Sequence, residues 1–245
     1  MFDQYPKTRP PLPESIRALY VSQYKTNREG GTTAASMAQR LESWLHRQVA
    51  ADVADPDGAS RATLELGAGT LNQLPYEPRA EPYDIVEPFT ELFERSPLLP
   101  RVGRVFADTA DVPADARYDR ITSVATLEHI CDLPDVVARC GLLLADGGAF
   151  RAGIPNEGTW LWTLGWKLTT GLEFRLRHGL DYGDLMRHEH VNTSRDIEQV
   201  VQHFFGRTRC KVFGISRGTA LYRYYECRDP DLDRCRQQLD RATAR

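Results

Sequence analysis

The sequence predicts an α/β fold in which a mostly parallel, seven-stranded sheet lies between two layers of helices. From residue 62 onward, short apolar segments alternate with helical or turn segments, a pattern typical of parallel strands joined by crossovers. Near the end, two apolar segments flank the tight turn 217–219 and predict an antiparallel hairpin. With 245 residues, 41% of them hydrophobic, the chain is long enough to bury such a core.

Residues 1–58 are expected to form an arm and a helical cap ahead of the sheet. The proline-rich start, through about residue 14, predicts an extended or poorly ordered arm. A helix is expected over 13–24, followed by a break at 27–31. A second helix should end near residue 50, because positions 37, 41, 44, 45 and 49 are apolar and share one helical face. The Asp, Pro and Gly content of 52–60 predicts a loop.

The main domain, 59–228, contains the predicted strands. They cover 62–66, 83–87, 102–108, 118–125 and 148–155, and the hairpin strands cover 209–216 and 220–227. A helix over 133–144 and a turn over 145–148 should join the fourth and fifth strands. Residues 156–192 lack strand alternation and predict a helical insertion over one end of the sheet. A helix starting at Thr193 has Asp196 in a capping-box position, and 229–245 should form a polar C-terminal helix.

Charge and composition favour a small-molecule ligand. A net charge of −3 offers no general attraction for a polyanion, so we expect no nucleic-acid partner. The start lacks the pattern of a signal peptide and no apolar run reaches membrane-spanning length, so we expect a cytoplasmic protein without a membrane partner. Five cysteines without C-x-x-C spacing predict neither a disulfide framework nor a structural zinc site. The oligomeric state stays open.

The segment TLELGAGTLNQL, residues 63–74, predicts a glycine turn directly after a strand. Such a turn lets a ligand approach bare backbone at the carboxyl ends of the strands. Gly67 and Gly69 are followed by Leu71 and Asn72, so the glycine pattern that seats a pyrophosphate is incomplete. Glu65 at the mouth of the turn would repel phosphate and favour a cationic ligand. The turn therefore predicts a nucleoside-like ligand with positive charge.

Two further carboxylates end the next two predicted strands. Glu87 lies where it can accept hydrogen bonds from both hydroxyls of a ribose. Asp108 can accept one from an exocyclic amine of adenine, next to the backbone of Thr109. Either residue taken singly could instead cap a strand end or lie on the surface. Three acids ending three successive strands favour a shared ligand.

These motifs resemble those of class I S-adenosylmethionine-dependent methyltransferases. The resemblance covers about residues 60–155 and rests on ELGAG, ADTADVP, YDRITSVATLEHI and LLLADGGAFRAGIP. It implies a Rossmann-like three-layer sandwich and S-adenosyl-L-methionine as cofactor, with Glu87 on the ribose and Asp108 on the adenine. The chain departs from the family at Leu71, which replaces a third glycine, and in its short first crossover. The implied cofactor-binding residues are Glu65, Gly67, Ala68, Gly69, Asn72, Glu87, Pro88, Asp108, Thr109 and Ala125.

The acceptor side is less defined by the sequence. His129 follows the fourth predicted strand and is a candidate general base, with packing or capping as the alternative. His188 and His190 are rival bases; with Glu189 they lack a further placed ligand, so no metal is expected. The candidate substrate-binding residues are Tyr24, Arg28, Trp160 and His190.

The predicted activity is transfer of a methyl group to a small molecule, with oxygen on a sugar-like or secondary-metabolite acceptor as the favoured target. Two alternatives stay open. One is a non-catalytic methyltransferase-like binding module, suggested by the missing third glycine. The other is an NAD-dependent reductase, which Glu65 and Leu71 disfavour.

Overall fold

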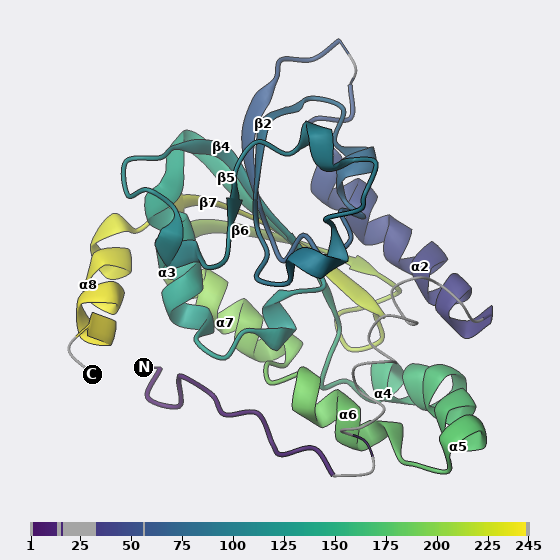
Figure 1. Cartoon of the computed structure of the whole chain (residues 1–245). Coiled ribbons are helices and arrows are strands. Elements are labelled where there is room, and N and C mark those ends of the chain that lie inside the picture. Colours follow the sequence, from purple (N-terminus) through teal and green to yellow (C-terminus); the bar gives the residue numbers. More distant parts are fainter. Residues whose placement is uncertain (1, 14–15, 17–32, 56, 244–245) are drawn as a thin grey trace.

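The computed structural model describes residues 2–13, 16, 33–55 and 57–243 (Figure 1). In that part of the chain, seven strands form one sheet in the order β3-β2-β1-β4-β5-β7-β6. Strands β1 to β5 run parallel, and β7 is antiparallel to both β5 and β6, which confirms the predicted sheet. The strands are β1 (Arg61–Leu66), β2 (Ala80–Val86), β3 (Val105–Phe106), β4 (Tyr118–Val124), β5 (Leu144–Pro155), β6 (Phe205–Phe213) and β7 (Tyr222–Pro230).

Helices cover the two faces of the β4-β5-β7-β6 half of the sheet, so the three-layer prediction is confirmed. Helix α2 (Thr33–Ala50) packs against β4, β5 and β7 from one side. Helices α3 (Leu133–Leu143), α7 (Ser194–Phe204) and α8 (Leu232–Thr243) pack together on the other side (Figure 1). The core follows the helical spacing of apolar residues: Leu133, Val137 and Cys140 of α3 are fully buried against Phe150 of β5.

The β3-β2-β1 half is built differently, because its crossovers contain only short 3-10 helices. These are η1 (Leu74–Tyr76), η2 (Thr90–Leu92) and η3 (Leu99–Arg101). A small apolar cluster fills the space that a crossover helix would occupy, with Leu71, Leu74, Ile85 and Phe93 at its centre. The short first crossover predicted from the sequence is therefore present.

Several predicted boundaries are wrong. Strand β3 has two residues rather than the seven of 102–108, because it lies at the sheet edge and has a partner only in β2. Strand β5 begins at Leu144 instead of 148, since its first residues pair with β4 across a bulge. The hairpin loop spans 214–221 rather than a tight turn, with Gly214 at φ +147°. The helix expected over 13–24 lies almost wholly outside the described residues.

The predicted helical insertion over 156–192 is present. It contains α4 (Trp160–Trp166), a π-helical turn (Lys167–Gly171), α5 (Leu172–His178) and α6 (Tyr182–Glu189). Helix α7 then starts with the predicted capping box between Thr193 and Asp196. Within the described ranges, no helix combines the length and apolar character needed to cross a membrane.

The N-terminal arm, residues 2–13, has no helix or strand but packs against the domain. Tyr5 Oη donates to Asn192 Oδ1, between α6 and α7, at 3.0 Å, and Lys7 Nζ donates to Asp196 Oδ2 of α7 at 2.9 Å. Figure 1 shows this arm running along the edge formed by α6 and α7. The arm therefore brings its residues to the same end of the sheet as the insertion.

Candidate functional site

A cavity of about 810 Å³ opens at the carboxyl ends of β1, β2, β3 and β4. The order of the sheet reverses between β1 and β4, and such a switch point is where open α/β sheets bind ligands. Its volume is within the range of small-molecule sites. The lining residues are Arg9, Leu66, Gly67, Val86, Glu87, Pro88, Phe89, Glu91, Leu92, Ala107, Asp108, Thr109, Ala125, Thr126, His129, Ile130, Asp132, Val136, His188 and Glu189.

The glycine turn forms one wall of this cavity. Gly67 has a φ of +66°, and a Cβ there would lie 2.4 Å from side-chain atoms of Thr126, so only glycine fits. Leu71, at the place of the third glycine, also has a left-handed φ of +65°. Its side chain is fully buried in the apolar cluster under the turn. The turn thus keeps its left-handed backbone without the glycine, because burial of Leu71 offsets the strain.

Glu87 is held in place by backbone on both sides. One carboxylate oxygen accepts from Gly69 N–H at 2.8 Å and the other from Phe89 N–H at 3.0 Å. The residue is only 5% exposed and lines the cavity. Each oxygen keeps a second lone pair, so the carboxylate can still accept two hydroxyl hydrogen bonds.

Asp108 lines the cavity and also caps the 3-10 helix Thr109–Asp111. Its Oδ1 accepts from Ala110 N–H at 2.7 Å, while Asp111 returns a bond to the Asp108 N–H. The capping alternative of the sequence therefore holds for Asp108, together with a place on the cavity wall. Thr109, Pro88 and Ala125 line the cavity as well.

Glu65 does not line the cavity, which corrects the orientation expected from the sequence. Strand alternation places its side chain on a buried face of the sheet. There Glu65 is 2% exposed and accepts a hydrogen bond from Tyr83 Oη at 2.6 Å. Burial raises the pKa of Glu65 to about 8, against the lowering effect of the Tyr83 hydrogen bond. In this structure the carboxyl group therefore lies in the core, bonded to Tyr83.

Three of the other predicted cofactor-binding residues do not line the cavity. Ala68 is buried in the apolar cluster, Asn72 is exposed, and neither lines the cavity. Gly69 does not line the cavity either, but its N–H donates to the Glu87 carboxylate and so orients it. Thr126, which the sequence did not single out, lines the cavity and packs on Gly67. A threonine two residues after a strand has no signal of its own in the sequence.

One end of the cavity is lined by His129, His188, Arg9 and Glu189. We call it the acceptor end, because it contains two of the histidines that the sequence predicted to face the acceptor. His129 belongs to the 3-10 helix Leu127–His129, and its Nδ1 lies 3.0 Å from the carbonyl oxygen of Glu189. His188 Nδ1 is 2.6 Å from the carbonyl oxygen of Pro10 in the arm. Arg9 donates to the His129 carbonyl at 3.0 Å. The sequence missed Arg9 and Glu189, because their place follows from long-range packing of the arm.

His190 lies beside His129 with ring centroids 4.8 Å apart. Its Nδ1 is 2.7 Å from the carboxylate of Glu157. Burial lowers the pKa of His190, but the Glu157 hydrogen bond and the nearby charge of Glu128 outweigh it, so the pKa is raised. His188, the other histidine of the H-x-H motif, contacts the arm at Pro10 instead of this pair.

Two substrate-binding predictions, Tyr24 and Arg28, lie outside the described residues. Trp160, the third candidate, is 65% exposed and does not line the cavity. Of the predicted acceptor residues, His129 and His190 are the ones that the structure brings together.

No family model matches the chain, and no curated protein matches it. Solved structures share its fold at low identity. The plantazolicin methyltransferase BpumL, solved with SAH, is 12% identical, with a TM-score of 0.59 over 88% of this chain and 94% of that one. A possible histamine N-methyltransferase from Thermotoga maritima is 14% identical, with a TM-score of 0.51 over 78% and 94%.

A third match shows that part of a longer protein can share the fold. An O-methyltransferase family protein from Burkholderia thailandensis is 14% identical, with a TM-score of 0.50, and covers 79% of this chain. The chain spans about half the length of that protein, 56%. The strand order, the antiparallel last hairpin and these matches agree. The chain has the Rossmann-like fold of class I S-adenosylmethionine-dependent methyltransferases.

Proposed function

We propose that the protein is an S-adenosylmethionine-dependent methyltransferase that acts on a small-molecule acceptor. The observation that carries the proposal is the orientation of Glu87, a buried carboxylate fixed by two backbone N–H groups at the edge of the cavity. A fixed acceptor of this kind suits the two hydroxyls of a ribose. The resemblance of motifs and the SAH held by BpumL in the same fold support the choice of cofactor.

The lining residues fit the cofactor in charge and shape. Glu87 would hold the ribose, while Asp108 and the Thr109 backbone would border the adenine. The bare backbone of Gly67 would let the methionine part approach the turn beside Thr126, because Gly67 has no side chain of its own. When bound, the cofactor supplies a methyl group made electrophilic by its sulfonium. The chain then has to align the acceptor and, for a hydroxyl, promote the loss of its proton.

We assign the acceptor to the end of the cavity next to His129. The Nδ1 of His129 faces a carbonyl oxygen, which only accepts, so this nitrogen carries the proton and Nε2 has the free lone pair. A polar group with a free lone pair beside the cavity favours oxygen as the methylated atom. Both sides of this region, the arm and the insertion, would shape the choice among sugar-like or secondary-metabolite acceptors.

A reductase that binds a dinucleotide is disfavoured by the turn. A pyrophosphate needs the N-terminus of a helix after the glycines, and here only the three-residue 3-10 helix Leu74–Tyr76 follows. The binding-module alternative differs from the leading proposal in turnover alone. Consumption of the cofactor in the presence of acceptors therefore separates them.

The first test is calorimetric titration of the purified chain with S-adenosylmethionine and SAH. Wild type should bind both at a 1:1 ratio, and Glu87→Ala should weaken binding by about 100-fold, the effect of losing two charge-assisted hydrogen bonds. Glu94→Ala is the matched control, since Glu94 is exposed and does not line the cavity. Saturable binding of NADH with no binding of S-adenosylmethionine would overturn the proposal. Thermal unfolding of each variant checks that the fold is intact.

A further inference from the structure

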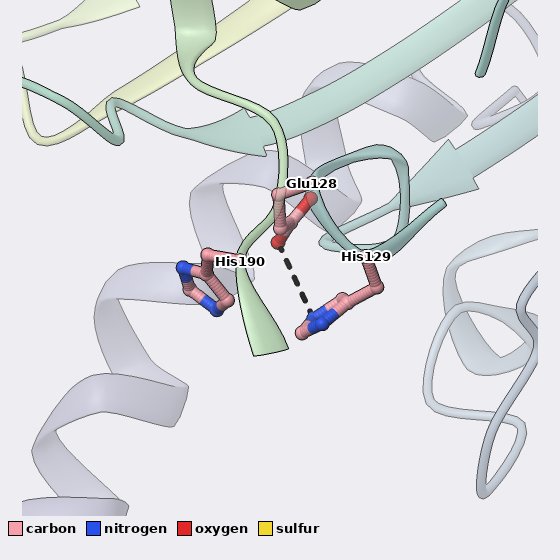
Figure 2. Close-up of side chains that lie close together, drawn as sticks. All are labelled: Glu128, His129 and His190. Atoms are coloured by element: carbon pink, nitrogen blue, oxygen red, sulfur yellow. Dashed lines mark ion pairs between the residues drawn. The ribbon is translucent and has the colours of Figure 1, made fainter. Parts of the chain in front are cut away.

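Three side chains at the acceptor end point their ligand atoms toward one another. Glu128, His129 and His190 each place one such atom within 4.8 Å of the other two. Figure 2 shows the Glu128 carboxylate between the two imidazole rings in this view. Glu128 and His129 come from the turn after β4, and His190 follows α6. Residues from two distant segments thus converge on one point.

Both rings are oriented by hydrogen bonds at Nδ1. His190 Nδ1 bonds to the Glu157 carboxylate at 2.7 Å, and His129 Nδ1 to the Glu189 carbonyl at 3.0 Å. Because both partners are acceptors, Nδ1 carries the proton in each ring, and in the neutral form of the ring Nε2 has the lone pair that a metal ion requires. Metal-binding histidines are usually fixed in this way by a carboxylate or a carbonyl.

Among the described residues, no hydrogen bond accounts for the burial of one oxygen of Glu128. The residue is 1% exposed, and its Oε2 is buried without a hydrogen bond. Its Oε1 lies 3.9 Å from His129 Nε2, which is too long for a hydrogen bond. A buried carboxylate oxygen without a hydrogen bond is costly, and a bound cation would compensate for that cost.

Asn192 locks the two segments together and so preforms the cluster. Its side-chain N–H groups donate to the carbonyls of Leu127 at 2.9 Å and Ile130 at 2.7 Å, and its backbone N–H donates to Glu128 O at 3.0 Å. Asn192 is itself fully buried and accepts from Tyr5 of the arm. The ligands therefore do not have to be assembled from mobile chain when an ion binds.

We propose that Glu128, His129 and His190 bind a divalent transition-metal ion at the acceptor end of the cavity. Two imidazoles and one carboxylate suit zinc, cobalt, iron(II) or manganese better than magnesium, which prefers oxygen ligands. Bond lengths of about 2.0–2.2 Å would draw the three ligand atoms closer than they lie here. Three protein ligands leave positions open for another molecule, as in catalytic sites. The sequence predicted no metal, because His188, Glu189 and His190 alone did not complete a site.

The role of the ion rests on the proposed function, although its binding does not. His129 lines the cavity and belongs to the cluster, so an acceptor hydroxyl beside it could occupy an open position. With His129 Nε2 bound to the ion, that nitrogen cannot also take up the proton. Coordination would instead lower the pKa of the hydroxyl, and its proton would pass to water. The oxygen lone pair then forms the new C–O bond, while the C–S bond of the cofactor breaks and its electron pair stays on sulfur.

The test is calorimetric titration of chelator-treated full-length chain with cobalt(II), zinc and, for comparison, magnesium. We expect one cobalt or zinc ion per chain, with a visible absorption spectrum of cobalt that reports nitrogen ligation, and magnesium bound at least 100-fold more weakly. Glu128→Gln and His190→Gln should each weaken cobalt binding by at least 10-fold. Glu157→Gln, which leaves all three ligands in place, should weaken it by about 10–100-fold.

His188→Gln is the matched control, because it removes the other histidine of the same motif and should leave cobalt affinity unchanged. Cobalt binding that is equal in wild type and Glu128→Gln, or absent from folded wild type, would overturn the metal site. Titration of the same samples with S-adenosylmethionine keeps the two proposals apart. Cofactor binding without metal binding removes only the metal site, whereas metal binding without cofactor binding removes the methyltransferase.

Discussion

The two ends of the cavity are built by different means. At the cofactor end, successive strands each contribute the residues that directly follow them, such as Gly67, Glu87 and Asp108. At the acceptor end, His129, His190 and Arg9 come from a turn, an insertion and the N-terminal arm. The first end depends on backbone turns at strand ends, and the second on long-range hydrogen bonds. We therefore expect that a substitution at one end can disable it while the other end stays intact.

The cofactor end also lacks the helical cover that supports the other half of the sheet. Its crossovers contain only 3-10 helices among the described residues, and a cluster around Leu71 and Phe93 fills the space. Arg101 contributes by donating to the carbonyls of Leu74 and Glu77. The turn is thus stabilised from below by packing instead of by a helix that starts at its glycines.

The largest effect on ligand binding is expected from Gly67→Ala. The new Cβ would lie 2.4 Å from Thr126 at a left-handed φ, so the turn and the end of β4 must separate. We expect loss of S-adenosylmethionine binding and a decrease of about 3–4 kcal/mol in the free energy of unfolding, measured by urea denaturation. Gly147→Ala is the control: its φ is +73° but no atom lies within 4 Å, so about 1 kcal/mol is expected. Equal costs at both sites would contradict the steric explanation.

Asn192→Ala should disable the acceptor end alone. The carbonyls of Leu127 and Ile130 would lose their donor and Tyr5 its acceptor, for a cost of about 2–3 kcal/mol in unfolding free energy. Cobalt affinity should fall by about 10-fold or more, while affinity for S-adenosylmethionine changes by less than about 3-fold. Calorimetry with both ligands on one sample measures the two effects together. Parallel loss of both affinities would show that the ends are not independent.

Leu71→Gly tests why the third glycine is dispensable. Glycine relieves a left-handed backbone, worth about 1–2 kcal/mol, but removes a fully buried leucine, worth about 2–5 kcal/mol. We therefore expect net destabilisation of about 2 kcal/mol and only a few-fold weaker cofactor binding. Denaturant unfolding and cofactor titration give both values. A more stable variant would mean that strain, not packing, dominates at this position.

Glu65→Gln should have the smallest effect on ligand binding, since Glu65 lies behind the cavity wall. Its carboxyl loses a proton near its ordinary pKa of 4.5 in the unfolded chain but only near 8 in the folded one. The folded state therefore binds more protons between these values, and wild-type stability falls as pH rises through them. The variant has no such titration. Its free energy of unfolding, measured with urea and compared with that of wild type, should therefore rise from about pH 5 to about pH 8. A constant difference would contradict the raised pKa.

Prediction from sequence succeeded where a residue's place follows from its neighbours along the chain. Glu87 and Asp108 follow apolar strands, and Thr193 has its capping partner three residues later. Glu65 lies in the expected strand, but its side chain is buried against Tyr83 and not at the mouth of the turn, because alternation within a strand decides which face a side chain occupies. Prediction was wrong for strand 102–108, because pairing at a sheet edge depends on the partner strand.

The sequence by itself determined the strand succession, the glycine turn and the acids that end the second and third strands, because these patterns are local and periodic. Only the tertiary structure decided that His190 meets His129 while His188 turns to the arm, and that Glu128 is buried beside both rings. Hydrogen bonds from Asn192 and Tyr5 join segments far apart in the chain. Such pairings carry no spacing that a sequence pattern could reveal.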